Sequence, residues 1–157
     1  MNDGQDGTGM KYLMHVGVCV RDLAVSTRFY RDGLGFAEAG ELSVEGEPTA
    51  TMLGIEDVSL HAIYLERDGY RIELLHYPRP GTVGPTEPRP MNQPGLTHFA
   101  IRVEDLDAAI GRIKAYGGRV LEKSRVRNDA FDANLCYVTD PDGTRIELVE
   151  TPNDPTR

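Results

Sequence analysis

The chain has 157 residues, the size of about one domain, with 39% hydrophobic residues, 27% charged residues and 17 glycines. This ordinary composition argues against a disordered or collagen-like chain, and no run of 18 apolar residues is present that could cross a membrane. A formal net charge of −8 argues against binding to nucleic acid or to an anionic membrane, because both require a basic surface.

The two ends and the cysteines indicate the cellular setting. Residues 1–10 are rich in Gly and Asp and lack an apolar core, so they predict a flexible tail rather than a signal peptide; a second short tail is expected at 152–157. Cys19 and Cys136 are too few for a disulfide framework. We therefore expect a cytoplasmic protein with free thiols.

The first half of the chain opens with a strand. Apolar residues alternate over His15–Val20, which places His15 and the valines on opposite faces. Asp22 is a suitable N-cap for a helix from about Leu23 to Arg31, with Val25 and Phe29 turned inward. Further along, Asp-Gly at positions 68–69 predicts a hairpin turn between the last two strands of this half.

Prolines separate this half from the next. Six of the ten prolines fall between Pro78 and Pro94. Neither a helix nor a central strand tolerates that density. Residues 78–94 are therefore predicted to form a linker, which in a compact protein connects two units or covers a site.

The second half begins with a strand at His98 and continues with a helix capped by Asp105. Leu106, Ile110 and Ile113 form one apolar stripe on that helix, and the glycines at 117 and 118 end it. Three strands are predicted after the helix, near residues 119–124, 134–140 and 144–150, with a hairpin turn at the Asp-Gly of positions 142–143.

An internal repeat relates the two halves. The nine residues from His15 match those from His98 at an offset of 83, and Asp68–Leu74 matches Asp142–Leu148 at an offset of 74. The difference of nine residues implies a longer middle in the first copy, around 43–57. The sequence thus predicts an α+β fold of two tandem βαβββ modules, at 11–77 and 95–151.

Each copy carries a histidine at the start of its first strand and a glutamate within its last strand. These residues are His15 and Glu73 in the first copy, and His98 and Glu147 in the second. A carboxylate between apolar neighbours must meet water, a partner charge or a metal. If the sheet curls, the four side chains can bind one divalent transition metal and leave positions open for water or substrate. The alternative interpretation is that these side chains face solvent or pack against neighbours without binding a metal.

These motifs resemble the vicinal oxygen chelate superfamily, which includes glyoxalase I, methylmalonyl-CoA epimerase, extradiol dioxygenases and fosfomycin thiol transferases. The resemblance rests on the two His-led strands, on Phe29–Phe36 and on Asp140–Leu148. It implies a curved mixed-sheet cup around one divalent ion (Ni, Co, Zn, Mn or Fe), ligands matching the four residues above, a small-molecule substrate and a homodimer. Whether the site lies in one chain or is shared between two is left open.

The resemblance implies three candidate functions. The first is a metal-dependent isomerase, epimerase or lyase that forms an enediolate by proton loss next to a carbonyl, with Glu147 or Glu73 as the base. The second is an Fe(II)-dependent extradiol-type dioxygenase, which would use His15, His98 and Glu147 only. The third is a non-catalytic small-molecule binding or resistance protein, disfavoured by the complete ligand set. No residue pattern identifies a thiol or CoA co-substrate.

Several further residues are weaker candidates for substrate contact. Arg71, Arg145 and Arg102 share a strand face with the predicted ligands, and Tyr137 is a further candidate. His61 and His76 have no histidine counterpart in the second copy, so we expect core or surface roles for them.

Overall fold

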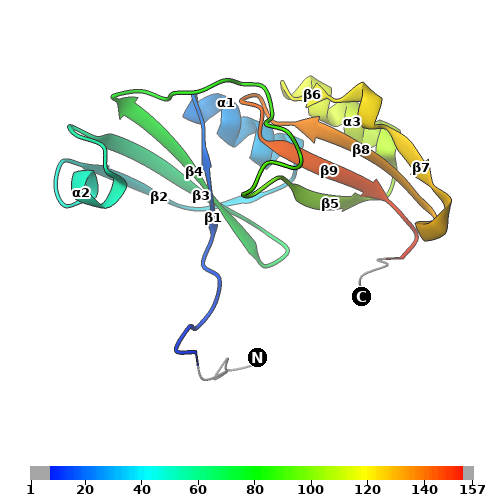
Figure 1. The fold of residues 1–157 in the computed structure, drawn as a ribbon, viewed down its shortest axis with the longest axis horizontal. Helices are drawn as coiled ribbons and strands as arrows, with labels where there is room; N and C mark the ends of the chain where they lie inside the picture. Colours follow the sequence, from blue (N-terminus) through cyan, green and yellow to red (C-terminus); the bar gives the residue numbers. More distant parts are fainter. Residues whose placement is uncertain (1–7, 154–157) are drawn as a thin grey trace.

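The computed structural model describes residues 8–153 and consists of two βαβββ modules joined through their helices (Figure 1). Residues 1–7 and 154–157, which make up most of the two predicted tails, lie outside the described residues. Within the described part, no helix is long and apolar enough to cross a membrane.

The first module forms a four-stranded sheet with strand order β1-β4-β3-β2. Its elements are β1 (Val16–Cys19), α1 (Leu23–Arg28), a π-helical turn (Phe29–Gly33), β2 (Ala37–Glu45), α2 (Thr49–Leu53), β3 (Ser59–Arg67) and β4 (Tyr70–Arg79). β1 runs parallel to β4, whereas the other pairs are antiparallel. The short helix α2 accounts for the longer middle predicted for this copy.

The second module repeats this topology with strand order β5-β9-β8-β6, and β7 pairs with β8. Its elements are β5 (Phe99–Val103), α3 (Leu106–Ala115), β6 (Arg119–Val120), a 3₁₀ turn (Glu122–Ser124), β7 (Val126–Asn128), a second 3₁₀ turn (Asp129–Phe131), β8 (Ala133–Thr139) and β9 (Arg145–Glu150). The predicted mixed α+β class is confirmed, and β5 is parallel to β9 as β1 is to β4.

The predicted helix caps are confirmed. The carboxylate of Asp22 accepts the amide hydrogen of Val25 at 3.0 Å, and Asp105 does the same for Ala108 at 2.9 Å. The prediction that Val25 faces inward is wrong, since this residue is 46% exposed. The first helix widens into a π-helical turn at Phe29, and Ser26 and Thr27 take the buried positions on the preceding turn.

The strand predicted at 119–124 is also shorter than expected. β6 ends at Val120, because the hydroxyl of Ser124 accepts the amide hydrogen of Tyr137 at 2.8 Å and so takes the place of a backbone partner. The same hydroxyl donates to the carbonyl of Leu121 at 2.6 Å, which closes a tight turn. The chain then forms β7, a strand that the sequence pattern did not predict.

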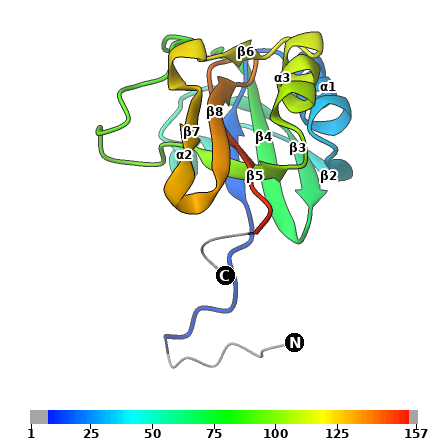
Figure 2. The same ribbon diagram turned by 90° about the vertical axis from the view of Figure 1, so that its right-hand side faces the viewer.

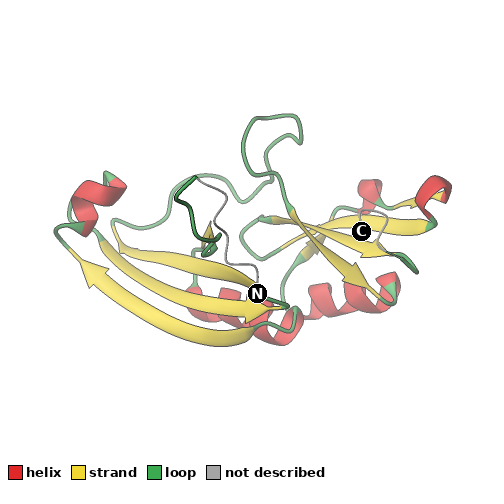
Figure 3. Cartoon of the chain, turned by 90° about the horizontal axis from the view of Figure 1, so that it is seen from below, coloured by secondary structure: helices red, strands yellow, loops and turns green. Residues whose placement is uncertain are grey.

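One hydrophobic core spans both modules. Its members come from both sheets and from both helices, and include Phe29, Leu65, Leu74, Ile113 and Ile146. Helices α1 and α3 lie on the same side of the two sheets (Figure 3) and near each other in the turned view (Figure 2). The opposite face of each sheet is therefore left for a site.

A buried polar contact ties the modules together. The hydroxyl of Tyr30, in the π-helical turn, donates to Oδ2 of Asp140, in the turn between β8 and β9, at 3.0 Å. Arg112 of α3 donates to the carbonyl of Gly33 at 2.8 Å. The two modules of one chain are thus fixed to each other through their helix side.

Arginines hold the proline-rich linker against the second module. Arg119 contacts Glu87 at 2.7 Å, and Arg145 donates to the carbonyl of Arg89 at 2.7 Å. Figure 2 shows the linker on the far side of β7 and β8 from helices α1 and α3.

Candidate metal centre

The first pair of predicted ligands lies on the face of the first sheet opposite the hydrophobic core. His15 directly precedes β1, and the parallel register of β1 and β4 sets Gly17 opposite Glu73. The two side chains meet with 3.1 Å between His15 Nε2 and Glu73 Oε2. Glu73 is only 8% exposed, and within the described residues His15 is its one ion-pair partner. We call this pair the first half-site.

The second pair repeats this arrangement in the second sheet. His98 precedes β5, and Ala100 stands opposite Glu147 in the parallel register of β5 and β9. His98 Nε2 lies 3.2 Å from Glu147 Oε2. The other ring nitrogen, Nδ1, is hydrogen-bonded to the hydroxyl of Thr97 at 2.9 Å, which leaves Nε2 directed at the carboxylate. We call this pair the second half-site.

A tyrosine accompanies each half-site. Tyr64 lies opposite Glu73 across β3 and β4, and its ring meets the His15 ring edge-to-face at 5.7 Å between centroids. Tyr137 lies opposite Glu147 across β8 and β9, and meets His98 in the same way at 5.3 Å. The alternation of side chains along β3 could have identified Tyr64 as a neighbour of Glu73. The internal repeat does not align Tyr64 with Tyr137 directly, because they are 73 rather than 74 residues apart: the second hairpin is one residue longer.

The phenol groups are held in their neutral form. Hydrogen bonding to Glu73, followed by burial, raises the pKa of Tyr64 above its ordinary value. Burial, followed by the charge of Glu147, raises the pKa of Tyr137. Both hydroxyls therefore keep their protons at neutral pH and can serve as hydrogen-bond donors.

The predicted arginines do not neutralise the glutamates. Arg71 donates to Glu66 Oε1 at 2.6 Å and lies over the Tyr64 ring at 5.8 Å. Arg145 is taken up by the carbonyl of Arg89, described above, and lies 6.0 Å from the Tyr137 ring. Neither guanidinium forms an ion pair with Glu73 or Glu147 among the described residues.

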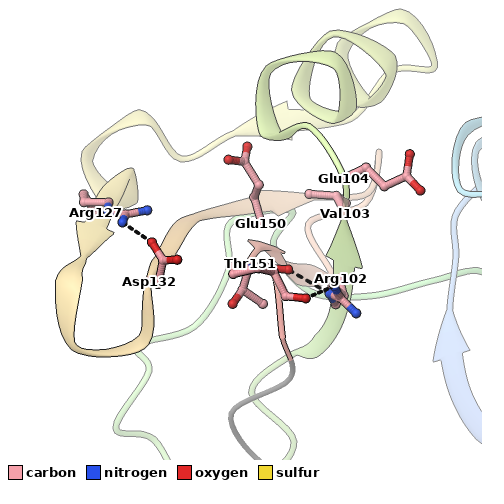
Figure 4. Close-up of a pocket in the computed structure, with 8 residues that line it drawn as sticks. Arg102, Val103, Glu104, Arg127, Asp132, Glu150 and Thr151 are labelled. Carbon is pink, nitrogen blue, oxygen red and sulfur yellow. Dashed lines mark hydrogen bonds and ion pairs between the residues drawn. The ribbon is translucent and has the colours of Figure 1, made fainter.

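Arg102 lines the groove between the modules that His15 and Glu147 also line, whereas the remaining histidines form a separate pair. Arg102 donates to the carbonyl of Thr151 at 2.9 Å, in a surface hollow of about 750 Å³ shown in Figure 4. Glu150 in the same hollow caps the start of α3 by accepting the amide hydrogen of Leu106. His61 and His76 face each other across β3 and β4 as a separate pair.

The structure keeps the two half-sites apart within one chain. Across residues 8–153, no group of three or more His, Cys, Asp or Glu side chains could together hold a metal ion. His15 and Glu147 nevertheless line one groove of about 1140 Å³ between the modules. Imidazole nitrogen and carboxylate oxygen suit a divalent transition metal, and each half-site fits half of such a donor set.

Two βαβββ modules, each with a His directly before its first strand and a Glu within its last strand, define a class of protein built from paired modules. The chain belongs to the Glyoxalase/Bleomycin resistance protein/Dioxygenase superfamily, whose profile matches residues 12–148.

Curated relatives and a solved structure agree with this assignment. The chain is 30% identical to the uncharacterized protein YaeR of Escherichia coli, over 90% of this chain and 98% of that one. It is 31% identical to the ethylmalonyl-CoA/methylmalonyl-CoA epimerase of Cereibacter sphaeroides, over 87% and 95%. A glyoxalase family protein from Bacillus cereus shares the fold, with a TM-score of 0.77, 23% identity and coverage of 93% and 99%.

Proposed function

We propose that this protein is a divalent-metal-dependent isomerase, epimerase or lyase that removes a proton from a carbon next to a carbonyl group. The observation that supports this proposal is the repeated pairing of one histidine with one glutamate, which has no arginine or lysine partner among the described residues. A carboxylate as buried as Glu73 is costly without a countercharge, and a divalent ion would supply it.

The four predicted ligands would have different roles in the proposed reaction. His15 and His98, with Glu73 and Glu147, would hold the ion. When bound, the ion would act as a Lewis acid toward the negative charge that develops on the carbonyl oxygen. Glu147 has the more exposed carboxylate, with 20% of its side chain accessible against 11% for Glu73. We therefore assign proton abstraction to Glu147 and the more permanent ligand role to Glu73, with the reverse assignment as the alternative.

The separation of the half-sites supports completion of the centre by a second copy of the chain. Each chain offers one half-site per sheet, and both modules of a chain are fixed through their buried helix side by the Tyr30–Asp140 contact. In a two-fold dimer, the first half-site of one chain can face the second half-site of the other, which gives two equivalent four-ligand centres. We propose such a homodimer.

The first test is elemental analysis of the purified protein, followed by proton-exchange assays with the metal found. Candidate substrates are 2-substituted acyl-CoA esters and adducts of α-keto aldehydes with thiols. Incorporation of solvent deuterium next to the carbonyl, lost on treatment with a chelator, is the expected result. Oxygen uptake with a catechol under Fe(II) would favour a dioxygenase instead, and a protein that takes up no metal would favour a binding role.

The second test concerns the base. Glu147→Gln should retain the bound metal but lose deuterium exchange by about two orders of magnitude or more. Glu45→Gln removes an exposed carboxylate on β2 and serves as the control. Full exchange by Glu147→Gln, together with loss of exchange by Glu73→Gln, would transfer the base role to Glu73.

A further inference from the structure

The internal repeat extends beyond the predicted ligands to the side chains that hold them. In each module a tyrosine on the neighbouring strand lies opposite the glutamate and meets the histidine ring edge-to-face. Edge-to-face pairs are directional, because the positive edge of one ring points at the negative face of the other. A histidine held in this way keeps a fixed ring plane before any metal arrives.

The two histidines differ in how many contacts orient them. The ring of His98 is held twice, by Tyr137 and by the hydroxyl of Thr97 on Nδ1. His15 follows Met14, which offers no side-chain hydrogen-bond donor or strong acceptor. Among the described residues, Tyr64 provides the aromatic contact that can fix the ring plane of His15.

The geometry assigns Tyr64 and Tyr137 as positioning residues of the proposed metal centre, which orient the rings of His15 and His98 so that Nε2 faces the ion. This inference rests on the proposed function, because it supposes that the two histidines bind a metal. Outer contacts that orient ligand histidines typically change metal affinity by 10- to 100-fold. The orienting role belongs to the ring, whereas the Tyr64 hydroxyl contacts Glu73 rather than His15, so phenylalanine should replace tyrosine at both positions.

The test compares Co²⁺ affinity, measured by calorimetry on the full-length protein, with and without the aromatic ring. We expect Tyr64→Leu to weaken binding about tenfold or more, and Tyr137→Leu to weaken it less, because Thr97 still holds His98. The phenylalanine variants should stay within about threefold of the wild type. Phe131→Leu, at an exposed position in the second 3₁₀ turn, is the matched control and should bind normally.

A double-mutant cycle separates orientation of one ring from general damage to the fold. In a His15→Ala background, Tyr64→Leu should no longer change Co²⁺ affinity. In a His98→Ala background, it should still cost about tenfold. Equal effects in the two backgrounds, or phenylalanine variants as weak as the leucine variants, would overturn the positioning role.

Folding and function are separated within the same experiment. The phenylalanine variants keep the ring packing, so Co²⁺ binding more than about threefold weaker in them would overturn the role of the ring even if a leucine variant fails to fold. Wild-type protein that binds Co²⁺ with no coupling between Tyr64 and His15 would overturn this inference alone. Wild-type protein that binds no Co²⁺ would overturn both this inference and the proposed metal-dependent function.

Discussion

The buried contact between Tyr30 and Asp140 offers a direct test of how the modules are joined. Both residues are fully buried, and the phenol donates to Oδ2 of Asp140 at 3.0 Å. The other carboxylate oxygen accepts the amide hydrogens of Asp142 and Thr144, at 3.0 and 2.7 Å. Tyr30→Phe therefore removes one hydroxyl and leaves Oδ2 without this donor, while the ring stays in place.

The size of the effect follows from this geometry. A hydrogen bond to a charged group contributes about 1.5–3 kcal/mol, and the phenylalanine ring keeps its edge-to-face contacts with Phe29 and Phe36, so no cavity forms. We expect the free energy of unfolding to fall by about 1.5–3 kcal/mol at pH 7. For a chain of this length that corresponds to a fall in Tm of roughly 3–12 °C.

The loss should depend on pH. Burial raises the pKa of Asp140 above its ordinary value of 3.8, so folding favours the protonated acid. This favourable contribution is present below pH 3.8 and is lost as the pH rises through the folded-state pKa. Below that pKa the acceptor is a neutral carboxyl group, whose hydrogen bond is worth only about 0.5–1.5 kcal/mol. The cost of Tyr30→Phe should therefore shrink as the pH approaches 3.8.

Urea unfolding followed by far-ultraviolet circular dichroism, at pH 7 and near pH 3.8, measures both effects. Tyr70→Phe, at an exposed position on β4, is the control and should change the free energy of unfolding by less than about 0.5 kcal/mol. A loss for Tyr30→Phe as small as that of the control, or one equal at both pH values, would refute the role of this contact.

Three further predictions test the proposed centre and the linker. Adding the cognate metal at 100 times its Kd should stabilise the protein by about 2.7 kcal/mol, seen as a rise in Tm, and a chelator should reverse the rise. His15→Ala and His98→Ala should each bind the metal more weakly at every site. Unfolding and refolding the two variants together should restore tight binding at about a quarter of the sites, because mixed dimers regain one intact centre; no recovery would place each centre within one chain. Gly143→Ala should lower the free energy of unfolding by more than about 2 kcal/mol, because a Cβ there would lie 1.9 Å from the carbonyl oxygen of Thr86. Gly54→Ala, also at positive φ but in open space, is the control and should lower it by about 1 kcal/mol. Urea titration measures both values.

The repeat made most of the fold predictable. Its two matched blocks contain the first strand with its helix cap and the last strand with its turn, and these are the elements that carry His15, Glu73, His98 and Glu147. Strand alternation alone placed each glutamate on the face opposite its apolar neighbours. The pairing of each histidine with its glutamate then follows from the parallel register of first and last strands.

The features that the sequence did not predict depend on side chains that replace backbone hydrogen-bond partners and on contacts between residues far apart in the chain. The hydroxyl of Ser124 shortens β6 by taking the place of a backbone carbonyl as the acceptor for Tyr137. The pattern of apolar residues cannot predict such a replacement. The π-helical turn at Phe29 changes the inward face of the first helix, which left Val25 exposed. The packing of the modules through their helices, which separates the half-sites, depends on contacts between distant residues such as Tyr30 and Asp140.

The two arginines show how these unpredicted contacts bear on the centre. Strand parity places Arg71 and Arg145 on the faces of Glu73 and Glu147, where either could have neutralised its neighbour. In the structure both arginines have other partners: Arg71 pairs with Glu66, and Arg145 donates to the linker carbonyl of Arg89. Neither glutamate is therefore paired with an arginine among the described residues. In the proposed homodimer, a divalent cation is the partner that best balances the two carboxylates of one centre.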